Sequence, residues 1–170
     1  MPISLVGSEM CIRDSYQPLM VLEEHGEPRC WQRIARYISR YDDWPVLHYG
    51  ETESLALLRM AQRQGTSEQQ QARLRRRLVD VHARIRQHWR LPLNSYGLKS
   101  VASWRGFQWG QSGVDGAHAL LWWRHWQGEG PERRGSSHAL RWIFRYNRDD
   151  CRATWAVADW LRHQDQAGGS

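Results

Sequence analysis

The sequence has few cysteines and no paired cysteine motif. Its three cysteines, Cys11, Cys30 and Cys151, are far apart and odd in number. No Cys-x-x-Cys spacing occurs, so the sequence indicates neither a zinc knuckle nor a disulfide framework. Disulfide-free chains are typical of reducing compartments, and we therefore expect a cytoplasmic protein.

Long apolar runs are also missing. The longest, residues 119–123, is far shorter than the ~20 apolar residues that a membrane-spanning helix needs. The N-terminus has no basic start followed by a long apolar core, so the sequence shows no secretory signal. We expect no membrane partner.

The composition is that of a folded, basic domain. The 170 residues are 41% hydrophobic, which is enough for one domain with its own core. The formal net charge is +6 and the pI is about 9.7, a balance that favours polyanionic partners. The eleven tryptophans allow two interpretations. Aromatic and arginine side chains together stack on nucleic-acid bases, but tryptophan is more often part of a core.

Residues 1–15 differ in character from the rest of the chain. Residues 8–15 resemble translated read-through from a sequencing adapter, as found in metagenomic gene models, although an ordinary flexible tail is the alternative. We expect a non-native or disordered junction over residues 1–15, one domain over residues 16–164, and a disordered tail over residues 165–170.

The hydrophobic pattern predicts one strand and several helices. An apolar β-type run at residues 46–49, closed by Gly50, indicates a buried strand. Thr52 is the expected N-cap of the helix that follows, and a capping-box pattern, Ser-x-x-Gln, begins at Ser67. The expected helices span residues 30–41, 52–65, 67–89, about 98–106, 116–127 and 138–164, with a loop at residues 128–137.

The helix at residues 138–164 contains an acid on its apolar face. Leu140, Ile143, Val157 and Leu161 recur at helical spacing, and Asp150 lies in the middle of that stripe. An inward-facing carboxylate is costly unless an arginine, a set of amide donors or a metal ion pairs with it. The alternative is that Asp150 is half exposed or pairs with a nearby arginine of its own helix.

Two further features have both a functional and a simpler interpretation. Glu53 falls in the first turn of a helix after a central strand, where open α/β sheets place ligands, but an acid there also complements the helix dipole. Arg73, Arg75, Arg76 and Arg77 form a basic cluster on the expected helix over residues 67–89. Such a cluster contacts phosphate in some proteins and is a solvated face in others.

Three segments in order carry a family resemblance. They are His-Tyr-Gly-Glu-Thr-Glu at residues 48–53, Tyr-Gly-Leu-Lys-Ser-Val-Ala at residues 96–102, and Tyr-Asn-Arg-Asp-Asp at residues 146–150. Together they resemble the C-terminal ribonuclease H-like domain of RecB-like nucleases, close in kind to the YprB type, within the DEDD superfamily of 3′–5′ exonucleases. The resemblance implies a partial ribonuclease H-like α/β fold, mostly helical here, with its N-terminal strands missing.

The same resemblance implies site residues and cofactors. Four acids of that superfamily hold two divalent ions, Mg²⁺ or Mn²⁺. Glu53 stands at the position of the third acid and Asp150 at that of the fourth, so both would be metal ligands. Tyr146 would orient the attacking water, which makes Tyr146, Asp150 and Glu53 the expected catalytic residues. Lys99, in the second segment, joins the four arginines as an expected nucleic-acid contact.

The first acidic motif of the superfamily, an Asp-x-Glu on an apolar strand, does not occur before Trp44. We therefore expect a truncated domain that is inactive by itself, preceded in the full-length protein by that motif and by a RecB-like nuclease domain. The expected function is hydrolysis of phosphodiester bonds in DNA or RNA by a metal-dependent, 3′–5′ exonuclease-like mechanism. The alternative is a non-catalytic nucleic-acid-binding or scaffold domain of a larger nuclease or helicase protein.

Overall fold

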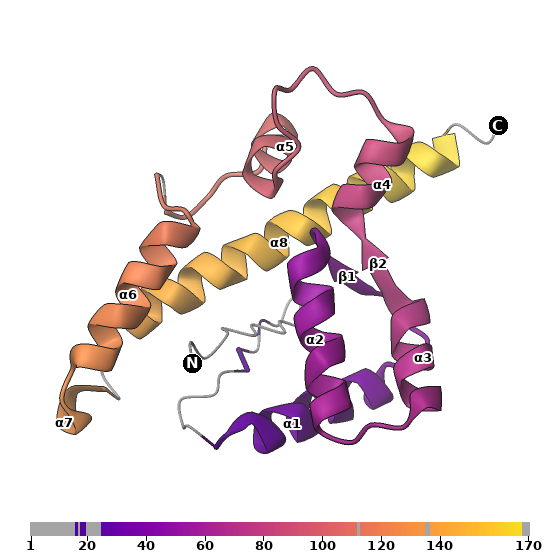
Figure 1. The fold of residues 1–170 in the computed structure, drawn as a ribbon. Helices are drawn as coiled ribbons and strands as arrows, with labels where there is room; N and C mark the ends of the chain where they lie inside the picture. The colour runs from indigo at the N-terminus through magenta and orange to yellow at the C-terminus, as the bar shows by residue number, and fades with distance from the viewer. Residues whose placement is uncertain (1–15, 17, 20–24, 112, 135–136, 168–170) are drawn as a thin grey trace.

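The computed structural model describes residues 16, 18–19, 25–111, 113–134 and 137–167. Over these residues the chain is mostly helical, as the sequence predicted, and contains a small parallel sheet of two strands, of which the sequence predicted one (Figure 1). The expectations for residues 1–15 and for the last three residues lie outside the described part, whereas residues 165–167, expected in a disordered tail, belong to the C-terminal helix. The elements are α1 (Glu27–Arg40), β1 (Val46–His48), α2 (Glu51–Arg63), α3 (Glu68–Arg77), β2 (Leu78–Asp80), α4 (Val81–His88), α5 (Leu98–Trp104), α6 (Gly116–Gly128), α7 (Pro131–Arg134) and α8 (His138–Ala167).

The two strands of the sheet are parallel and in register. Val46 lies opposite Leu78, and His48 lies opposite Asp80. The prediction of one unbroken helix over residues 67–89 is therefore wrong. The apolar spacing there fits a helix, but α3 ends at Arg77 and the next three residues extend to pair with β1. Backbone pairing between segments far apart in the sequence has overridden the local helical pattern.

Two smaller expectations also need correction. The N-cap of α2 is Gly50 and not Thr52, because the chain turns sharply at Gly50, whose φ is +94°. A positive φ is readily adopted by glycine, which has no Cβ to clash with the backbone. The expected loop at residues 128–137 contains the short helix α7. The capping box at Ser67 is confirmed, with the Gln70 N–H donating to the Ser67 hydroxyl.

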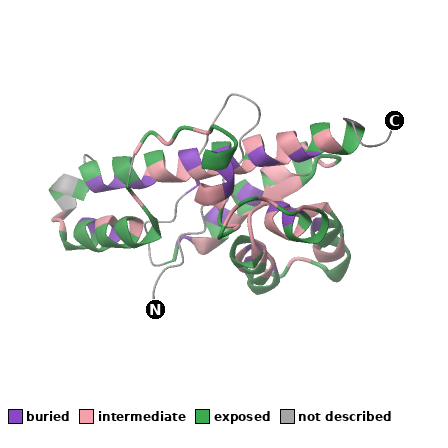
Figure 2. Ribbon diagram, turned by 90° about the horizontal axis from the view of Figure 1, so that it is seen from above, coloured by how far each residue is buried: buried purple, intermediate pink, exposed green. Residues whose placement is uncertain are grey.

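The longest helix, α8, connects two of the three hydrophobic cores. Its first half packs along α6, where Ile143 is fully buried against Trp123 and Trp126. Its second half packs on α4, α5 and the sheet, where Ala153 and Val157 are fully buried. Figure 1 shows α8 crossing the molecule, with α6 beside one half of the helix and the sheet near the other. Along α8, buried positions alternate with exposed ones (Figure 2).

The third core lies between α1, α2 and α3, and Arg77 joins this unit to β1. The Arg77 guanidinium donates hydrogen bonds to the carbonyls of Ile38, Tyr41 and Trp44, at 2.6–2.9 Å. These carbonyls lie at the end of α1 and in the loop before β1, where helix geometry leaves acceptors without partners. Arg77 therefore caps α1 from a neighbouring helix. No helix in the described part of the chain is long and apolar enough to cross a bilayer.

This cap makes Arg77 distinct from its neighbours in a stability measurement. Arg77→Ala should lower the free energy of unfolding by about 2–3 kcal/mol, because charge-assisted hydrogen bonds to half-buried carbonyls are lost. The matched control is Arg76→Ala, an exposed position on the same helix, which should change stability by less than about 0.5 kcal/mol. Urea unfolding followed by circular dichroism measures both, and equal effects would contradict the cap.

Candidate functional site

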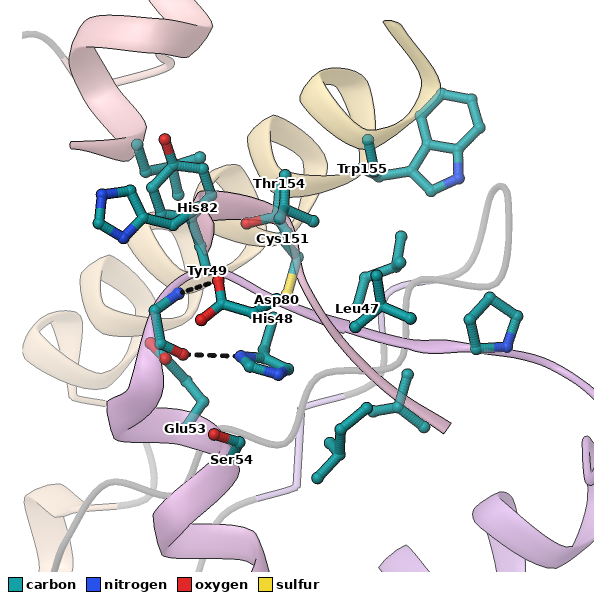
Figure 3. A pocket seen from close by; sticks show the side chains of 18 of the residues that line it. Leu47, His48, Tyr49, Glu53, Ser54, Asp80, His82, Cys151, Thr154 and Trp155 are labelled. Atoms are coloured by element: carbon teal, nitrogen blue, oxygen red, sulfur yellow. Dashed lines mark hydrogen bonds between the residues drawn. The ribbon is translucent and has the colours of Figure 1, made fainter. Parts of the chain in front are cut away.

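The site begins where the two parallel strands end. The Asp80 carboxylate accepts a hydrogen bond from the N–H of Gly50, at 3.1 Å (Figure 3). It accepts another from the N–H of Ala83, at 3.0 Å. On the neighbouring strand the His48 ring donates from Nδ1 to the Gly50 carbonyl, at 2.6 Å. Burial acts to raise the pKa of Asp80, but the N–H groups of Ala83 and Gly50, together with smaller effects of His48 and His82, hold the pKa below its ordinary value. Asp80 thus stays charged and fixes the turn that leads into α2.

That turn positions Glu53. The residue lies in the first turn of α2, as predicted, with an exposed side chain on the wall of a large open groove. The same groove is lined by Tyr146 and Asp150 of α8 and by Lys99 of α5. The structure therefore brings together four of the residues that the sequence singled out, from three elements.

Asp150 is the most strongly perturbed acid of this groove. Burial raises the pKa of Asp150 to about 6, against the opposing effects of the Lys99 ammonium and a hydrogen bond from the Tyr146 hydroxyl. The charges of Asp149 and Glu53 add to the increase in the pKa of Asp150. The largest cause is desolvation, so Asp150 is an acid whose charge the protein only partly compensates. The simpler alternative holds in part: Asp150 is partly exposed, but its pairing with an arginine of the same helix is not seen among the described contacts.

Lys99 lies between two aromatic rings at the edge of the site. Its Nζ is 5.5 Å from the ring centroid of Tyr146 and 5.5 Å from that of Trp109. A hydrogen bond helps to position Lys99. The Tyr49 hydroxyl, at the end of β1, donates to the Tyr96 carbonyl just before α5, at 2.6 Å. The second sequence segment is thereby tied to the first.

Sequence reasoning missed Asp149, the neighbour of Asp150. Asp149 is buried and accepts a hydrogen bond from the Gly110 N–H at 2.9 Å. The approach is close, since a Cβ at Gly110 would lie 2.9 Å from the Asp149 carboxylate. Asp149 thus fastens the glycine-containing loop before α6 to α8. Asp80 and His48 were missed as well, and the only sequence signal for Asp80 is its place before a predicted buried valine.

The four predicted arginines are not brought to the groove as a group. Arg73 pairs with Asp42, and Arg77 caps α1. Arg75 and Arg76 are exposed on α3, on the far side of the sheet from α5 (Figure 1). Of the predicted nucleic-acid contacts, only Lys99 lies beside Tyr146 and Asp150.

The donor set suits a hard divalent cation in kind. Glu53 and Asp150 offer carboxylate oxygens, which Mg²⁺ and Mn²⁺ prefer. A cation would also supply the charge compensation that Asp150 lacks. The donors are too few for a complete site, since no group of three His, Cys, Asp or Glu side chains suited to a metal occurs within the described ranges. The two carboxylates fit part of a metal site and not a complete two-metal centre.

The raised pKa of Asp150 predicts a particular pH dependence of stability. The carboxyl has an unfolded pKa of 3.8 and a folded pKa of about 6. Between these values the folded state binds more protons, so the free energy of unfolding falls as the pH rises. Asp150→Asn should therefore be more stable than the wild type at pH 7.5, by about 2 kcal/mol, and equal to it near pH 4.

The control for this measurement is Asp43→Asn, a change at an exposed aspartate. Thermal or urea unfolding at several pH values measures the three proteins. The burial argument fails if Asp150→Asn and Asp43→Asn show the same pH profile.

Comparison with known proteins gives one family match. A family model of the RNase H superfamily matches residues 5–162. This range begins within residues 1–15, the segment expected to be non-native or disordered. No curated protein and no solved structure matches the chain. The family match covers nearly the whole chain and includes β1, β2 and all the helices that line the groove. The chain belongs to the RNase H superfamily.

Proposed function

We propose that this domain is a metal-dependent nuclease that hydrolyses phosphodiester bonds in nucleic acid at the groove containing Glu53, Tyr146 and Asp150. Domains of the RNase H superfamily are generally nucleases that process nucleic acids. The observation that carries the proposal for this chain is Asp150. It is a partly buried acid with an incompletely compensated charge, beside a tyrosine and in the same groove as a second carboxylate, at the ends of parallel strands. Open α/β sheets place their ligands at such strand ends.

Each residue has a chemical role in this proposal. Asp150 and Glu53 would hold Mg²⁺ or Mn²⁺, and such an ion would supply activation of water and stabilisation of charge on the phosphate oxygens. The Tyr146 hydroxyl holds the attacking water. Burial and the charge of Asp150 raise the pKa of Tyr146, so the hydroxyl keeps its proton and acts as a hydrogen-bond donor. Lys99, held over the Tyr146 ring, lies where it can contact a substrate phosphate.

The finer features of the proposal come from the sequence motifs. The Tyr-x-x-x-Asp pattern of residues 146–150 supports a 3′–5′ exonuclease-like reaction, with DNA or RNA as substrate. The same resemblance supports a RecB-like nuclease domain as a partner in the same polypeptide, and a cytoplasmic location.

A second function is supported by a specific observation. The residues described by the structure contain no set of three metal-binding side chains, while the chain has a net charge of +6. A domain of this kind that binds nucleic acid without cleaving it would be the non-catalytic or scaffold part of a larger nuclease or helicase. A nuclease would cleave the nucleic acid when Mn²⁺ is added, whereas a binding domain would leave it intact, and this difference can be measured.

The test uses the full-length natural protein that contains this domain and an end-labelled oligonucleotide with Mn²⁺. Asp150→Ala should abolish release of nucleotides, because a carboxylate that holds the ion is lost. Asp43→Ala, at an exposed position, should leave the rate unchanged. Mn²⁺ binding followed by electron paramagnetic resonance should weaken in Asp150→Ala and be weaker below about pH 6, where protons compete for Asp150.

Hydrolysis that continues in Asp150→Ala would contradict the assignment of Asp150. Oligonucleotide binding without Mn²⁺-dependent hydrolysis in the wild type would favour the non-catalytic function.

A further inference from the structure

The hairpin of α6 and the first half of α8 has an unusual charge pattern. Neither α6 nor residues 138–148 of α8 contain an aspartate or glutamate. The same two segments contain four arginines and three histidines. The absence of acids is local, because α8 has Asp149, Asp150, Asp159 and Asp165 further along. Residues 115–148 as a whole contain six arginines against Asp115, Glu129 and Glu132. Arg148 also lies 3.9 Å from Asp149, so this end of the molecule has an excess of positive charge that acids compensate only in part.

Aromatic rings cross the hairpin in a continuous series, here called the aromatic ladder. The ring centroids of His118 and Trp122 on α6 are 6.3 Å apart, and those of Trp122 and Trp142 are 5.6 Å apart across the two helices. The ring centroids of Trp142 and His138 on α8 are 6.4 Å apart. His118 and His138 are exposed, and Trp142 is 43% exposed. The neighbouring Trp123 and Trp126 are buried and form the core of the hairpin, and Trp122 is partly buried against it, so Trp142 is the more exposed tryptophan of the ladder.

The ladder leads to the proposed catalytic groove. On α8, His138, Trp142, Tyr146 and Asp150 follow one another at intervals of four residues, so each lies about one turn from the next. On α6, Asp115 is the N-cap, its charge contributes to the raised pKa of Tyr146, and it lines the same groove. The start of α6 therefore lies beside Tyr146, and both helices run from the groove along the ladder.

We propose that the aromatic ladder binds a single-stranded segment of nucleic acid outside the groove, with its bases stacked on Trp142 and Trp122. Arg145, exposed one turn after Trp142, contacts the phosphates. The route from the ladder into the groove rests on the proposed nuclease function, whereas binding to the ladder does not. Exposed aromatic rings stack on bases of any sequence, provided that the bases are not already stacked in a duplex.

The charge pattern selects this occupant over a protein. Leu120 and Leu121 are also exposed on α6 and would suit an apolar protein surface. A second copy of this chain would bring two hairpins with an excess of arginines against each other, and like charges in an interface are unfavourable. A polyanion with flat apolar bases satisfies both the positive charge and the exposed rings.

The test measures binding of fluorescein-labelled single-stranded oligothymidylate to the 170-residue chain by fluorescence anisotropy, in EDTA so that no hydrolysis occurs. Trp142→Ala should weaken binding about tenfold or more, because one stacking surface is lost. Trp142→Phe keeps an aromatic face and should restore most of the affinity. The matched control is Trp104→Ala, which removes another exposed tryptophan that lies beside an arginine on α5, outside the groove, and should have little effect.

A second variant tests the phosphate contact without changing the ladder. Arg145→Gln should reduce the slope of log affinity against log salt by about 0.7, the value for one single-strand phosphate contact. An unlabelled duplex of the same length should compete poorly with the single strand. Circular dichroism checks that each variant is folded.

Several results would overturn the proposal. Equal effects of Trp142→Ala and Trp104→Ala, or equal binding of duplex and single strand, would remove the stacking argument. A wild-type chain that dimerises through Trp142 in sedimentation experiments would show that a protein covers the ladder. Loss of hydrolysis in Asp150→Ala with unchanged binding in Trp142→Ala would leave the nuclease proposal standing and reject the ladder. Binding of the single strand to the ladder by a protein that shows no hydrolysis would support the ladder and reject the nuclease proposal.

Discussion

The Asp80 carboxylate is the interaction on which the arrangement of the groove depends. It accepts N–H groups from Gly50, at the end of β1, and from Ala83, in the first turn of α4. One side chain therefore closes the ends of both strands and starts a helix. The turn at Gly50 is narrow, with a positive φ, and α2 begins immediately after it. A shift of Asp80 would move the first turn of α2, and with it the direction in which Glu53 faces.

The groove combines a rigid frame with an unsatisfied charge. Asp80 is partly buried but receives two backbone donors, and its pKa is held low. Asp150 is partly buried too, but there desolvation dominates and its pKa rises to about 6. Structural acids are compensated by the protein itself, whereas an acid left partly uncompensated costs stability unless a ligand completes it. This contrast between two acids on one groove is the physical reason for placing the chemistry at Asp150.

The sequence predicts the helices well, because their apolar residues recur with helical periodicity over long segments. It also places Glu53 and Asp150 on the right elements, since both follow from local motifs. Of the two strands of the sheet, the sequence predicts β1 but not β2. β2 has three residues inside a helical pattern, and its partner is more than thirty residues away in the chain. Arg77 and Asp149 have roles that depend on carbonyl and N–H groups brought close only by folding, so no local pattern identifies them.

The two consecutive acids of α8 show how one helix serves both structure and chemistry. Successive residues of a helix differ in direction by about 100°, so Asp149 and Asp150 face different neighbours. Asp149 receives the Gly110 N–H and holds the loop before α6 against the helix. Asp150 faces the groove with Tyr146 and Lys99. The loop held by Asp149 leads to Asp115 and α6. Asp149, which the sequence analysis did not identify, therefore determines where the aromatic ladder begins relative to Asp150. Fixing that loop to the same turn of α8 keeps the hairpin and the groove in a constant relation, which a substrate bound to both requires.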